Sequence, residues 1–307
     1  MGDFEPGDKD SGIVFRQIET TQIRESADTG RLIFCGDNME LMKTLSPESI
    51  DLIYADPPFF SNRNHSAGAG NGEPGSFGDK WNGGLSEYLE WLEPRFVEMK
   101  RLLRMTGSIY VHLDWHASHY VKILLDRIFG YGNFRNEIIW YYKTGGTSSR
   151  HFGRKHDTIL FYTKTGNYFF RKTKEISYLM HRYGFSNIEI MNDGKGYYTL
   201  VGMRDVWDIP ALRGNQPERV NYPAQKPEAL LRRIIDASSR EGETVADFFA
   251  GSGTAAVVAE ELKRRWILCD VSRTAIDLIQ RRLSRRFASF RRDSLPQIDV
   301  CHSDSCE

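Results

Sequence analysis

The stretch "IDLIYADPPFF", residues 50–60, decides the fold, because it shows both a buried strand and the point where that strand ends. Its first half is an apolar run that suits a strand covered on both faces, as in a parallel sheet. Asp56 ends the run, and Pro57 and Pro58 then stop the strand, since proline has no N–H to donate to a sheet. Two phenylalanines follow. We therefore expect an acidic, rigid and aromatic loop at the carboxyl end of a buried strand.

Apolar runs typical of strands alternate with helical patterns on both sides of this stretch. Strands are expected at residues 32–37, 50–56, 107–114, 136–142, 157–164, 244–249 and 266–270. Helices are expected at residues 38–45, 86–103, 116–130 and 226–239, from Thr254, and in the arginine-rich segment after residue 270. Asn38 is the expected N-cap of the first helix. Strands that alternate with helices indicate an α/β fold with a doubly wound, mostly parallel sheet.

The pattern weakens after Lys164, where residues 165–220 mix glycine, basic and aromatic residues without a clear period. We interpret this segment as an inserted recognition region. Residues 57–85 are rich in glycine, asparagine and serine and predict a long loop, which in a compact domain is usually functional. At the two ends of the chain we expect a flexible segment at residues 1–30 and a tail at residues 291–307.

The 307 residues carry no net charge, with 41 basic and 41 acidic side chains, and 40% of them are apolar, as in ordinary globular proteins. There is no apolar stretch of about 18 residues, so no membrane span is predicted. The N-terminus lacks the basic and apolar blocks of a signal peptide, and we therefore expect a cytoplasmic protein. Basic residues gather in the middle of the chain and in residues 281–292, which favours a surface facing a polyanion. For residues 281–292, a solvated helix face explains the pattern equally well.

The four cysteines do not show the spacing of zinc ligands. Cys35 and Cys269 lie in or beside apolar runs and are expected to be core thiols. Cys301 and Cys306 lie in the tail, where they and His302 offer metal ligands, but a disordered tail is the favoured interpretation. We therefore predict no metal site.

A second informative stretch, "DFFAGSGTAA" at residues 247–256, joins an expected strand to an expected helix. Its glycines allow a tight turn and the close approach of a ligand to the backbone. The pattern G-x-G-x-x-A, with Asp270 ending the next strand, fits a dinucleotide or any other adenosine-bearing cofactor; a plain turn is the alternative. Asp247 would oppose a pyrophosphate but would bind an amino-acid ammonium group. Because the carboxyl ends of parallel strands share one edge, this loop and the loop at Asp56 are expected to face each other.

Together, the stretches "DPPF", "YPAQKPEALL" and "DFFAGSGT" resemble those of the amino-group DNA methyltransferases, which transfer methyl from S-adenosylmethionine to adenine N6 or cytosine N4. The catalytic stretch precedes the cofactor stretch, as in the permuted beta subgroup, where the target-recognition region lies between them. The resemblance spans residues 31–288 and implies a Rossmann-like methyltransferase fold. The parts it implies are a catalytic half (31–164), a target-recognition region (165–220) and a cofactor-binding half (221–290).

The resemblance assigns the catalytic step to the loop after the buried strand. The exocyclic amine of adenine is a poor nucleophile, because its lone pair is delocalised into the ring. Asp56 and the carbonyl of Pro57 would accept its hydrogens and localise that pair, and Pro58 would help to hold these acceptors in place before reaction. Phe59 would stack on the base, which must be flipped out of a duplex to reach such a loop.

The resemblance also assigns residues to the cofactor. Those around its methionine part would be Asp247, Phe249, Gly251, Ser252, Gly253 and Thr254. Asp270 would bind the ribose hydroxyls, Lys226 would approach the carboxylate, and Asp37 would lie near the cofactor or the base. Phe248 stands where the family usually has proline, which changes the rigidity of the turn but keeps every polar group.

Contacts to double-stranded DNA are expected from the basic middle of the chain. The residues expected at phosphates are Lys143, Arg150, Arg154, Lys155, Arg171, Lys172 and Lys174. The first four belong to a loop that would close over DNA, although an ordinary surface loop is the alternative. Residues 165–205 would contact base edges. Asp79 and Trp81 are candidates for the target pocket, with a plain hydrophobic anchor equally plausible for Trp81.

The leading hypothesis is therefore a site-specific DNA adenine N6-methyltransferase. The initial Asp of the catalytic stretch favours adenine, because family members that act on cytosine N4 more often begin it with Ser. Alternatives are a cytosine N4-methyltransferase, an enzyme that acts on RNA, a nucleotide-dependent dehydrogenase, and a non-catalytic DNA-binding protein with the same fold. The kinship further implies a prokaryotic or phage-encoded enzyme, with a homodimer and a cognate restriction endonuclease of a restriction-modification system as candidate partners.

Overall fold

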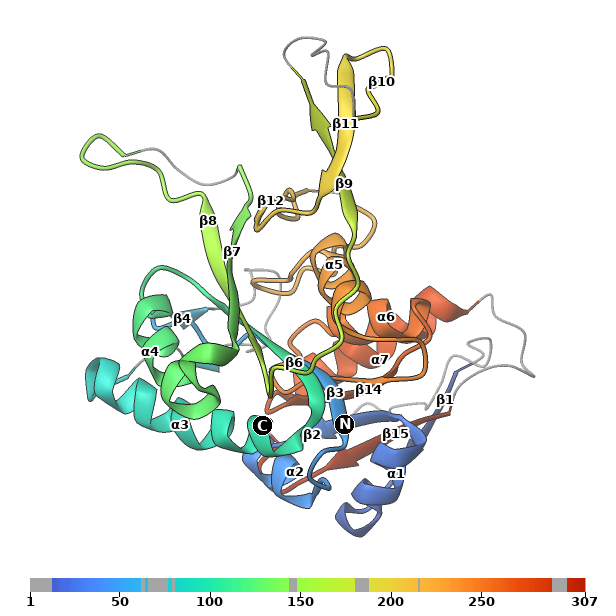
Figure 1. Cartoon of the computed structure of the whole chain (residues 1–307). Coiled ribbons are helices and arrows are strands. Elements are labelled where there is room, and N and C mark those ends of the chain that lie inside the picture. The colour runs from blue at the N-terminus through green and yellow to red at the C-terminus, as the bar shows by residue number, and fades with distance from the viewer. Residues whose placement is uncertain are drawn as a thin grey trace.

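The computed structural model describes residues 13–61, 64–65, 77–78, 81–143, 148–179, 188–214, 216–288 and 297–306. Within these residues a ten-stranded sheet forms the centre of the molecule (Figure 1). Its strands, in spatial order, are β1 (Val14–Gln17), β15 (Gln297–His302), β2 (Arg31–Cys35), β14 (Arg265–Asp270), β13 (Thr244–Asp247), β3 (Ile50–Ala55), β6 (Leu103–Leu113), β8 (His156–Thr163), β7 (Phe134–Tyr141) and β12 (Val206–Asp208). Neighbours are parallel except on the two sides of β8. This confirms the predicted α/β fold with a mostly parallel sheet.

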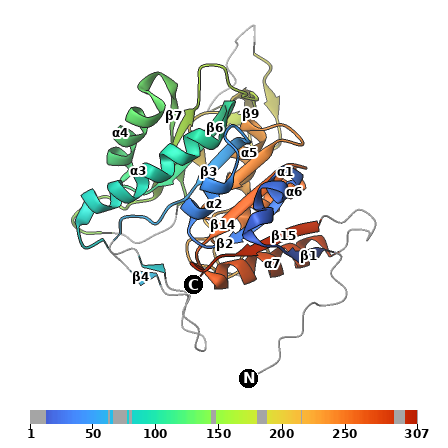
Figure 2. The same cartoon turned by 90° about the horizontal axis from the view of Figure 1, so that it is seen from below.

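Helices cover both faces of the sheet (Figure 2). One face carries α1 (Ile23–Thr29), α2 (Asn38–Thr44), α3 (Gly84–Leu102) and α4 (Ser118–Phe129), and the other carries α5 (Glu228–Ser238), α6 (Thr254–Glu261) and α7 (Arg273–Phe287). Successive strand residues belong to different apolar clusters: Ile33 packs with the second group of helices and Leu32 with the first. Because both faces are covered, the strands read as continuous apolar runs. None of the described helices is long and apolar enough to cross a membrane.

The four strands that carry the predicted site are neighbours in the sheet, in the order β2-β14-β13-β3. Their pairing is parallel, with Asp270 opposite Cys35 and Asp247 opposite Tyr54. All four carboxyl ends therefore meet at one edge of the sheet. Each strand ends in or just before an aspartate, and we call these four residues the acidic edge: Asp37, Asp270, Asp247 and Asp56.

The start of α2 differs by one residue from the prediction. Asn38 is the predicted N-cap, but Asp37 takes that position, and its carboxylate accepts a hydrogen bond from Met39 N at 2.7 Å. Asp and Asn cap equally well, so sequence alone does not separate them. Asn38 is instead buried and donates to Phe248 O at 3.0 Å. It thereby ties α2 to the strand end that precedes the glycine loop.

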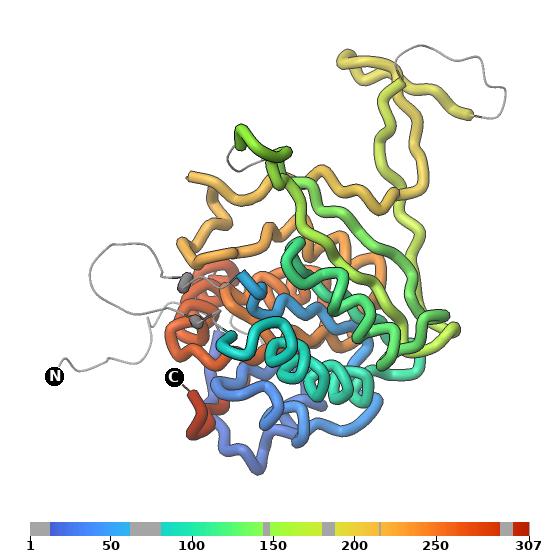
Figure 3. Tube along the Cα trace, turned by 90° about the vertical axis from the view of Figure 1, so that its left-hand side faces the viewer, coloured from blue at the N-terminus to red at the C-terminus, as the bar shows by residue number. Residues whose placement is uncertain are grey.

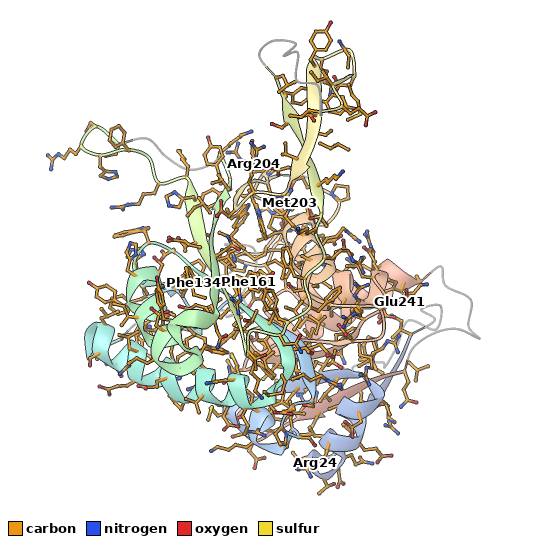
Figure 4. The ribbon with its side chains drawn as sticks, in the orientation of Figure 1. Arg24, Phe134, Phe161, Met203, Arg204 and Glu241 are labelled. Carbon is orange, nitrogen blue, oxygen red and sulfur yellow. A yellow bond between two sulfur atoms is a disulfide. The ribbon has the colours of Figure 1, made fainter. Side chains whose placement is uncertain are left out.

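The predicted recognition region, residues 165–220, does not form one lobe. Its middle is a three-stranded antiparallel sheet of β9 (Lys174–Tyr178), β10 (Met191–Asn192) and β11 (Tyr197–Gly202), which projects from the body and which we call the arm (Figure 3). Met203 N donates to Thr173 O at 3.0 Å at the base of the arm (Figure 4). After the arm, β12 returns to the central sheet and pairs with β7. The predicted boundary at residue 220 therefore includes a strand of the main sheet.

The described parts of both chain ends are more ordered than predicted, because they form one edge of the sheet. β1 pairs with β15, which in turn pairs with β2. Ile298 and Val300 of β15 are buried, and Arg16 of β1 makes a bidentate ion pair with Asp299, both contacts at 2.8 Å. The predictions of a flexible N-terminal segment and a disordered tail are therefore wrong for these parts. In the predicted loop 57–85, β4 (Asn64–His65) pairs with β5 (Phe77–Gly78).

The tail also changes the assignment of one cysteine. Cys35 is predicted to be a free core thiol, but it forms a disulfide with Cys306, with their Cα atoms 5.1 Å apart. The reason is topological: β15 lies beside β2, so the residues after β15 reach the carboxyl end of β2. Cys269 is a buried free thiol as predicted, and Cys301 is a second one, placed in β15.

Candidate active site

The loop after β3 and the glycine loop after β13 line one cavity of about 250 Å³ at the acidic edge. The predicted site residues that line it are Asp37, Asp56, Pro57, Pro58, Phe59, Lys226, Asp247, Phe249, Gly251, Ser252, Thr254 and Asp270. The predicted meeting of two stretches that are distant in the sequence is therefore found in the structure. This edge is also where a doubly wound sheet ordinarily places its ligand. The individual roles of these residues stay predictions.

The carboxylate of Asp56 has one occupied and one free oxygen. Its Oδ2 accepts a hydrogen bond from Lys226 Nζ at 2.5 Å, and only 17% of the Asp56 side chain and 8% of the Lys226 side chain are exposed. Its Oδ1 is buried and has no hydrogen-bond partner among the described residues. A buried acceptor without a donor is costly, so a ligand that donates to Oδ1 is favoured. Lys226 is predicted to bind the cofactor carboxylate, but in the structure it pairs with Asp56.

Contacts on two sides hold the loop after β3. Tyr88 of α3 donates its hydroxyl to Pro58 O at 2.8 Å. Phe59 packs against His112, with ring centroids 5.8 Å apart, and Lys226 Nζ lies 4.9 Å from the centroid of the Phe59 ring. The position of the aromatic ring is therefore fixed in the absence of any ligand.

Behind this loop lies a buried chain of hydrogen bonds that sequence reasoning missed. Tyr54 OH lies 2.7 Å from His112 Nδ1, and His112 Nε2 lies 3.2 Å from Asp157 Oδ2. Tyr142 OH donates to Asp157 Oδ1 at 3.2 Å. Burial would raise the pKa of Asp157, but His112, Lys226 and Tyr142 together lower it. Asp157 is therefore ionised and orients the imidazole on which the loop rests. The sequence feature that could have revealed this chain of hydrogen bonds is the presence of His112 and Asp157 inside two apolar runs.

The glycine loop binds the last carboxylate of β14 through its backbone. Asp270 Oδ2 accepts from Gly251 N at 2.7 Å, and Oδ1 accepts from Ser272 N at 2.9 Å. Burial raises the pKa of Asp270 against these two hydrogen bonds. Gly251 has a φ of 49°, and a Cβ there would lie 3.0 Å from the ring of Tyr222, so the position favours glycine. Each Asp270 oxygen keeps a second lone pair, which a ligand hydroxyl can use.

Gly253 is the predicted cofactor residue that does not line the cavity. Its φ is 71°, and a Cβ there would lie 2.7 Å from Ile279 Cγ1 of α7. Gly253 is also the N-cap of α6. Its role in the structure is therefore the close packing of α6 against α7.

Part of the basic segment 281–292 supports the glycine loop from behind. Arg282 is buried and donates to Ser252 O at 3.0 Å and to Thr254 Oγ1 at 2.9 Å. It also forms an ion pair with Glu228 at 2.9 Å, and Arg286 pairs with the same carboxylate at 3.3 Å. These two arginines are therefore structural, and the expectation of a surface facing a polyanion does not hold for them.

Asp247 is a buried carboxylate between two others. Its Oδ1 accepts a hydrogen bond from Phe249 N at 3.0 Å. Burial, helped by the nearby Asp56 and Asp270, raises the pKa of Asp247 to about 8 against the Phe249 hydrogen bond and the charge of Lys226. Asp247 is therefore mostly protonated at neutral pH when no cationic group lies beside it. A cationic ligand group would favour its ionised form.

Asp37 is bound by an arginine that sequence reasoning missed. Arg95 of α3 donates through Nη2 to Asp37 Oδ2 at 2.7 Å and through Nε to Asn38 Oδ1 at 2.9 Å. Its guanidinium lies 3.8 Å over the ring of Trp91, and both residues line the cavity. Nothing in an amphipathic helix pattern marks such residues. Tyr222 also lines the cavity. It begins the "YPAQKP" stretch, and its place in that stretch could have pointed to it.

The basic residues predicted to bind DNA lie on two segments, the loop between β7 and β8 and the residues that lead from the body into the arm (Figures 1 and 3). Arg171 still lies against α5, where its N donates to Ala237 O at 2.7 Å. Among them, Lys143 pairs with Asp208 at 2.5 Å, Arg171 pairs with Asp236 at 2.6 Å, and Arg154 lies 3.7 Å over the ring of Trp115. The others on these segments are Arg150, Lys155, Lys172 and Lys174. Lys143 and Arg171 would have to leave their carboxylates before contacting phosphates.

Trp81 packs between two aromatic residues of α3 and does not line the cavity. Its ring centroid lies 5.0 Å from that of Tyr88 and 5.3 Å from that of Trp91. The anchor interpretation therefore fits Trp81 better than a place in the target pocket. Asp79 lies outside the described residues.

The fold and the cavity together define a class of protein: a doubly wound α/β protein with a ligand cavity at the carboxyl edge of its sheet, lined by the glycine loop and the Asp56 loop. A family model described as DNA methylase, N6_N4_Mtase, matches residues 50–281. The chain belongs to this family of DNA methylases. Membership confirms the predicted amino-methyltransferase, with S-adenosylmethionine as its methyl donor and DNA as its substrate.

Similar proteins are found over most of the chain. The Type II methyltransferase M.HpaI of Haemophilus parainfluenzae is 30% identical over 263 residues, which cover 84% of this chain and 76% of that protein. The DNA adenine methyltransferase YhdJ of Escherichia coli (strain K12) is 30% identical over 270 residues, covering 86% of this chain and 85% of that protein. Both alignments therefore include the two loops of the cavity.

Solved structures share the fold at lower identity. The cytosine-N4-specific PvuII DNA methyltransferase has a TM-score of 0.59 and 16% identity, over 96% of this chain and 98% of that one. A DNA modification methylase, TTHA0409, from Thermus thermophilus, solved with S-adenosyl-L-methionine, has a TM-score of 0.58 and 19% identity, over 89% of this chain and 98% of that one. At these identities the likeness shows the fold alone.

Proposed function

We propose that this chain methylates adenine at N6 within a specific sequence of double-stranded DNA. The observation that carries the proposal is Asp56 Oδ1, a buried acceptor with no donor among the described residues, in a loop held at the edge of the cavity. An exocyclic amine is a donor that suits this oxygen. The Escherichia coli relative is named as an adenine methyltransferase, and this supports adenine as the base.

The cavity residues fit S-adenosylmethionine by the chemistry of their groups. Asp247 is buried and becomes an ionised partner once an ammonium group lies beside it. Asp270 keeps lone pairs for ribose hydroxyls next to Gly251 N. When bound, the cofactor supplies an electrophilic methyl group on a sulfonium. The carboxylate, the glycine backbone and the aromatic walls are this chain's own contribution to binding it.

At the acceptor, Asp56 Oδ1 and the carbonyl of Pro57 accept the two amine hydrogens, which turns the nitrogen lone pair toward the methyl group. The bound cofactor would supply the methyl group to this nitrogen. One amine proton then leaves to Asp56 or to water. Lys226 donates to the other oxygen of Asp56 and thereby fixes the carboxylate. Phe59, supported by His112, provides the stacking surface for a flipped base.

Cytosine N4 is the second candidate, because the PvuII enzyme of the same fold is cytosine-N4-specific. The Asp that begins "DPPF" favours adenine by the family pattern. A dehydrogenase is not supported, since the family model that matches residues 50–281 is described as a DNA methylase. A non-catalytic protein is disfavoured because the Asp56 loop is intact and held in place.

The decisive test compares the wild-type chain with Asp56→Ala and with Asp28→Ala, a control at an exposed position of α1. DNA from cells expressing each protein is digested to nucleosides and analysed by mass spectrometry, and long-read sequencing gives the modified sequence. We expect N6-methyladenine with the wild type and the control, and none with Asp56→Ala. S-adenosylhomocysteine should bind Asp56→Ala within a few-fold of the wild type.

N4-methylcytosine in place of N6-methyladenine would contradict the choice of base while leaving the role of Asp56 intact. Methylation by Asp56→Ala at near the wild-type rate would contradict the assignment of Asp56. Binding of a nicotinamide dinucleotide in preference to S-adenosylhomocysteine, measured by calorimetry, would overturn the enzyme class.

The kinship supports three further proposals. The catalytic half precedes the cofactor half, with the arm between them, as in the permuted beta subgroup. The chain pairs as a homodimer, and it protects DNA from a restriction endonuclease that cuts the same sequence. Sedimentation analysis and digestion of the methylated DNA with endonucleases of known specificity test the last two.

A further inference from the structure

Three metal-ligating side chains outside the cavity converge at the carboxyl ends of β2 and β15. They are Cys35, which ends β2, His302, which ends β15, and Cys306, four residues further on. One ligand atom from each, two sulfurs and an imidazole nitrogen, lies within 4.8 Å of the others. His302 Nδ1 and Cys306 Sγ are 3.5 Å apart. The function proposed above uses none of these residues.

We propose that, when the Cys35–Cys306 disulfide is reduced, Cys35, His302 and Cys306 bind a thiophilic divalent cation such as Zn²⁺. Two thiolates and one imidazole form a ligand set that suits Zn²⁺, with a fourth, tetrahedral position left for water. Cys35 is fully buried, whereas His302 and Cys306 are half-buried, so the site is fixed on one side and reachable on the other.

The chemistry of the two states balances. In the structure the two sulfurs are joined, and they cannot both act as thiolate ligands. A dithiol reductant transfers two electrons to the disulfide, and it becomes a disulfide itself while Cys35 and Cys306 become thiols. Zn²⁺ then displaces one proton from each thiol. The oxidised and the metal-bound forms are therefore mutually exclusive states of one site.

Local hydrogen bonds show that the site is built into the fold. Ser303 N donates to Cys35 O at 2.9 Å, which continues the β15–β2 pairing by one step. Ser305 Oγ accepts from Asp37 N at 2.8 Å and donates to Glu40 Oε2 at 3.0 Å. The segment that carries Cys306 is thus attached to the start of α2 whether or not the sulfurs are bonded. Asp37 also lines the cofactor cavity, so a bound metal would anchor that wall.

The experiment measures zinc in the full-length chain, purified in dithiothreitol, loaded with Zn²⁺ and freed of excess metal. We expect about one Zn²⁺ per chain by elemental analysis. The matched variants are Cys35→Ser and Cys306→Ser, which should hold no stoichiometric zinc, and His302→Gln, which should bind at least about tenfold more weakly. Cys301→Ala removes a buried free thiol beside His302 and should bind as the wild type does.

Cobalt substitution gives an independent reading. Reduced wild-type protein should show thiolate-to-Co²⁺ charge-transfer absorption, and protein oxidised to the disulfide should show none. Reduced wild-type protein without stoichiometric zinc would overturn the proposal, and so would equal zinc in Cys35→Ser and Cys306→Ser. A folded far-UV spectrum for each variant separates lost ligation from lost structure. None of these measurements depends on methyl transfer, so they test the metal site separately from the proposed function.

Discussion

The pairing of Lys226 with Asp56 brings a cation to the proposed catalytic carboxylate from a position 170 residues away in the sequence. Both side chains are largely buried, so the attraction is little screened by solvent. Removing the cation would leave Asp56 as a buried charge without a partner, which is strongly unfavourable. Lys226 is therefore expected to act on the methyl-transfer step through Asp56.

We predict that Lys226→Met lowers kcat for methyl transfer by about 100-fold, comparable to the loss of one preorganised electrostatic contact. Lys226→Arg should recover part of the rate, because the charge remains. The dissociation constant of S-adenosylhomocysteine, measured by calorimetry, should change only a few-fold. If Lys226→Met instead keeps kcat and mainly weakens cofactor binding, Lys226 serves the cofactor carboxylate, as the family resemblance implies.

The raised pKa of Asp247 gives cofactor binding a definite pH dependence. Without a cationic group beside it Asp247 is protonated below about pH 8, and the ammonium group of the cofactor requires the ionised form. Binding therefore releases one proton, so affinity rises with pH by up to about tenfold per pH unit between about pH 6 and pH 8, and then levels off. S-adenosylhomocysteine titrations at several pH values check this, and Asp247→Asn should bind weakly with a flat profile. A flat wild-type profile would contradict the prediction.

At the residue scale, the sequence predicts aspartates at strand ends well, because an acid that follows an apolar run is a local signal. Asp37, Asp56, Asp247 and Asp270 all line the cavity. The sequence does not predict the partners of these aspartates. Arg95 reaches Asp37 only because α3 packs across α2, and such packing depends on tertiary contacts that no single segment encodes.

At the scale of elements, long apolar runs predict strands correctly, but short strands at the edge of the sheet are not predicted. β1 has four residues, mostly exposed, and carries no alternating pattern. β15 has buried residues, but it follows a basic helix and precedes a polar end, so composition favours disorder. Its order comes from pairing with β2 and β1, a non-local effect. The arm is likewise not predicted as strands, because its residues show no clear periodicity of apolar side chains.

The start of the arm offers a test of DNA contact. Lys172 and Lys174 are exposed, and no described contact neutralises them. Changing both to Gln should raise the Kd for DNA by about tenfold and reduce the salt dependence of binding by roughly one slope unit for each lost phosphate contact. Fluorescence anisotropy with a labelled duplex measures both.

The matched control changes Lys43 of α2 and Lys263, which pairs with Glu241, to Gln; both residues lie away from the arm. The control should bind DNA as the wild type does, and both double variants should keep their affinity for S-adenosylhomocysteine. Unchanged DNA affinity in the Lys172 and Lys174 variant would exclude this segment from the interface.

On the scale of the whole molecule, a chain with no net charge separates its charges in space. Acids gather at the cavity, and basic side chains lie on segments that project beyond it (Figures 1 and 3). A polyanion is therefore attracted by the projections. The affinity for DNA should therefore fall as the salt concentration rises, even though the protein is neutral overall.

We predict that raising salt from about 50 to about 200 mM weakens DNA binding by at least tenfold, because cations are released from each contacted phosphate. S-adenosylhomocysteine binding should change far less over the same range, since its charged partners are buried and poorly screened. Anisotropy and calorimetry on one protein preparation give the two trends. A DNA affinity that stays constant across this range would contradict binding through phosphate contacts.

The acidic edge also bears on turnover. The methyl donor carries a positive sulfonium, whereas the spent molecule has lost that charge and keeps the rest of its groups. Asp37 and Asp56 are paired with Arg95 and Lys226, so Asp270, and Asp247 once the ammonium group has ionised it, are the carboxylates that attract the fresh molecule more strongly than the used one. The same negative potential keeps the sugar–phosphate backbone outside, and an uncharged nucleobase is the part of the duplex that can enter without electrostatic penalty.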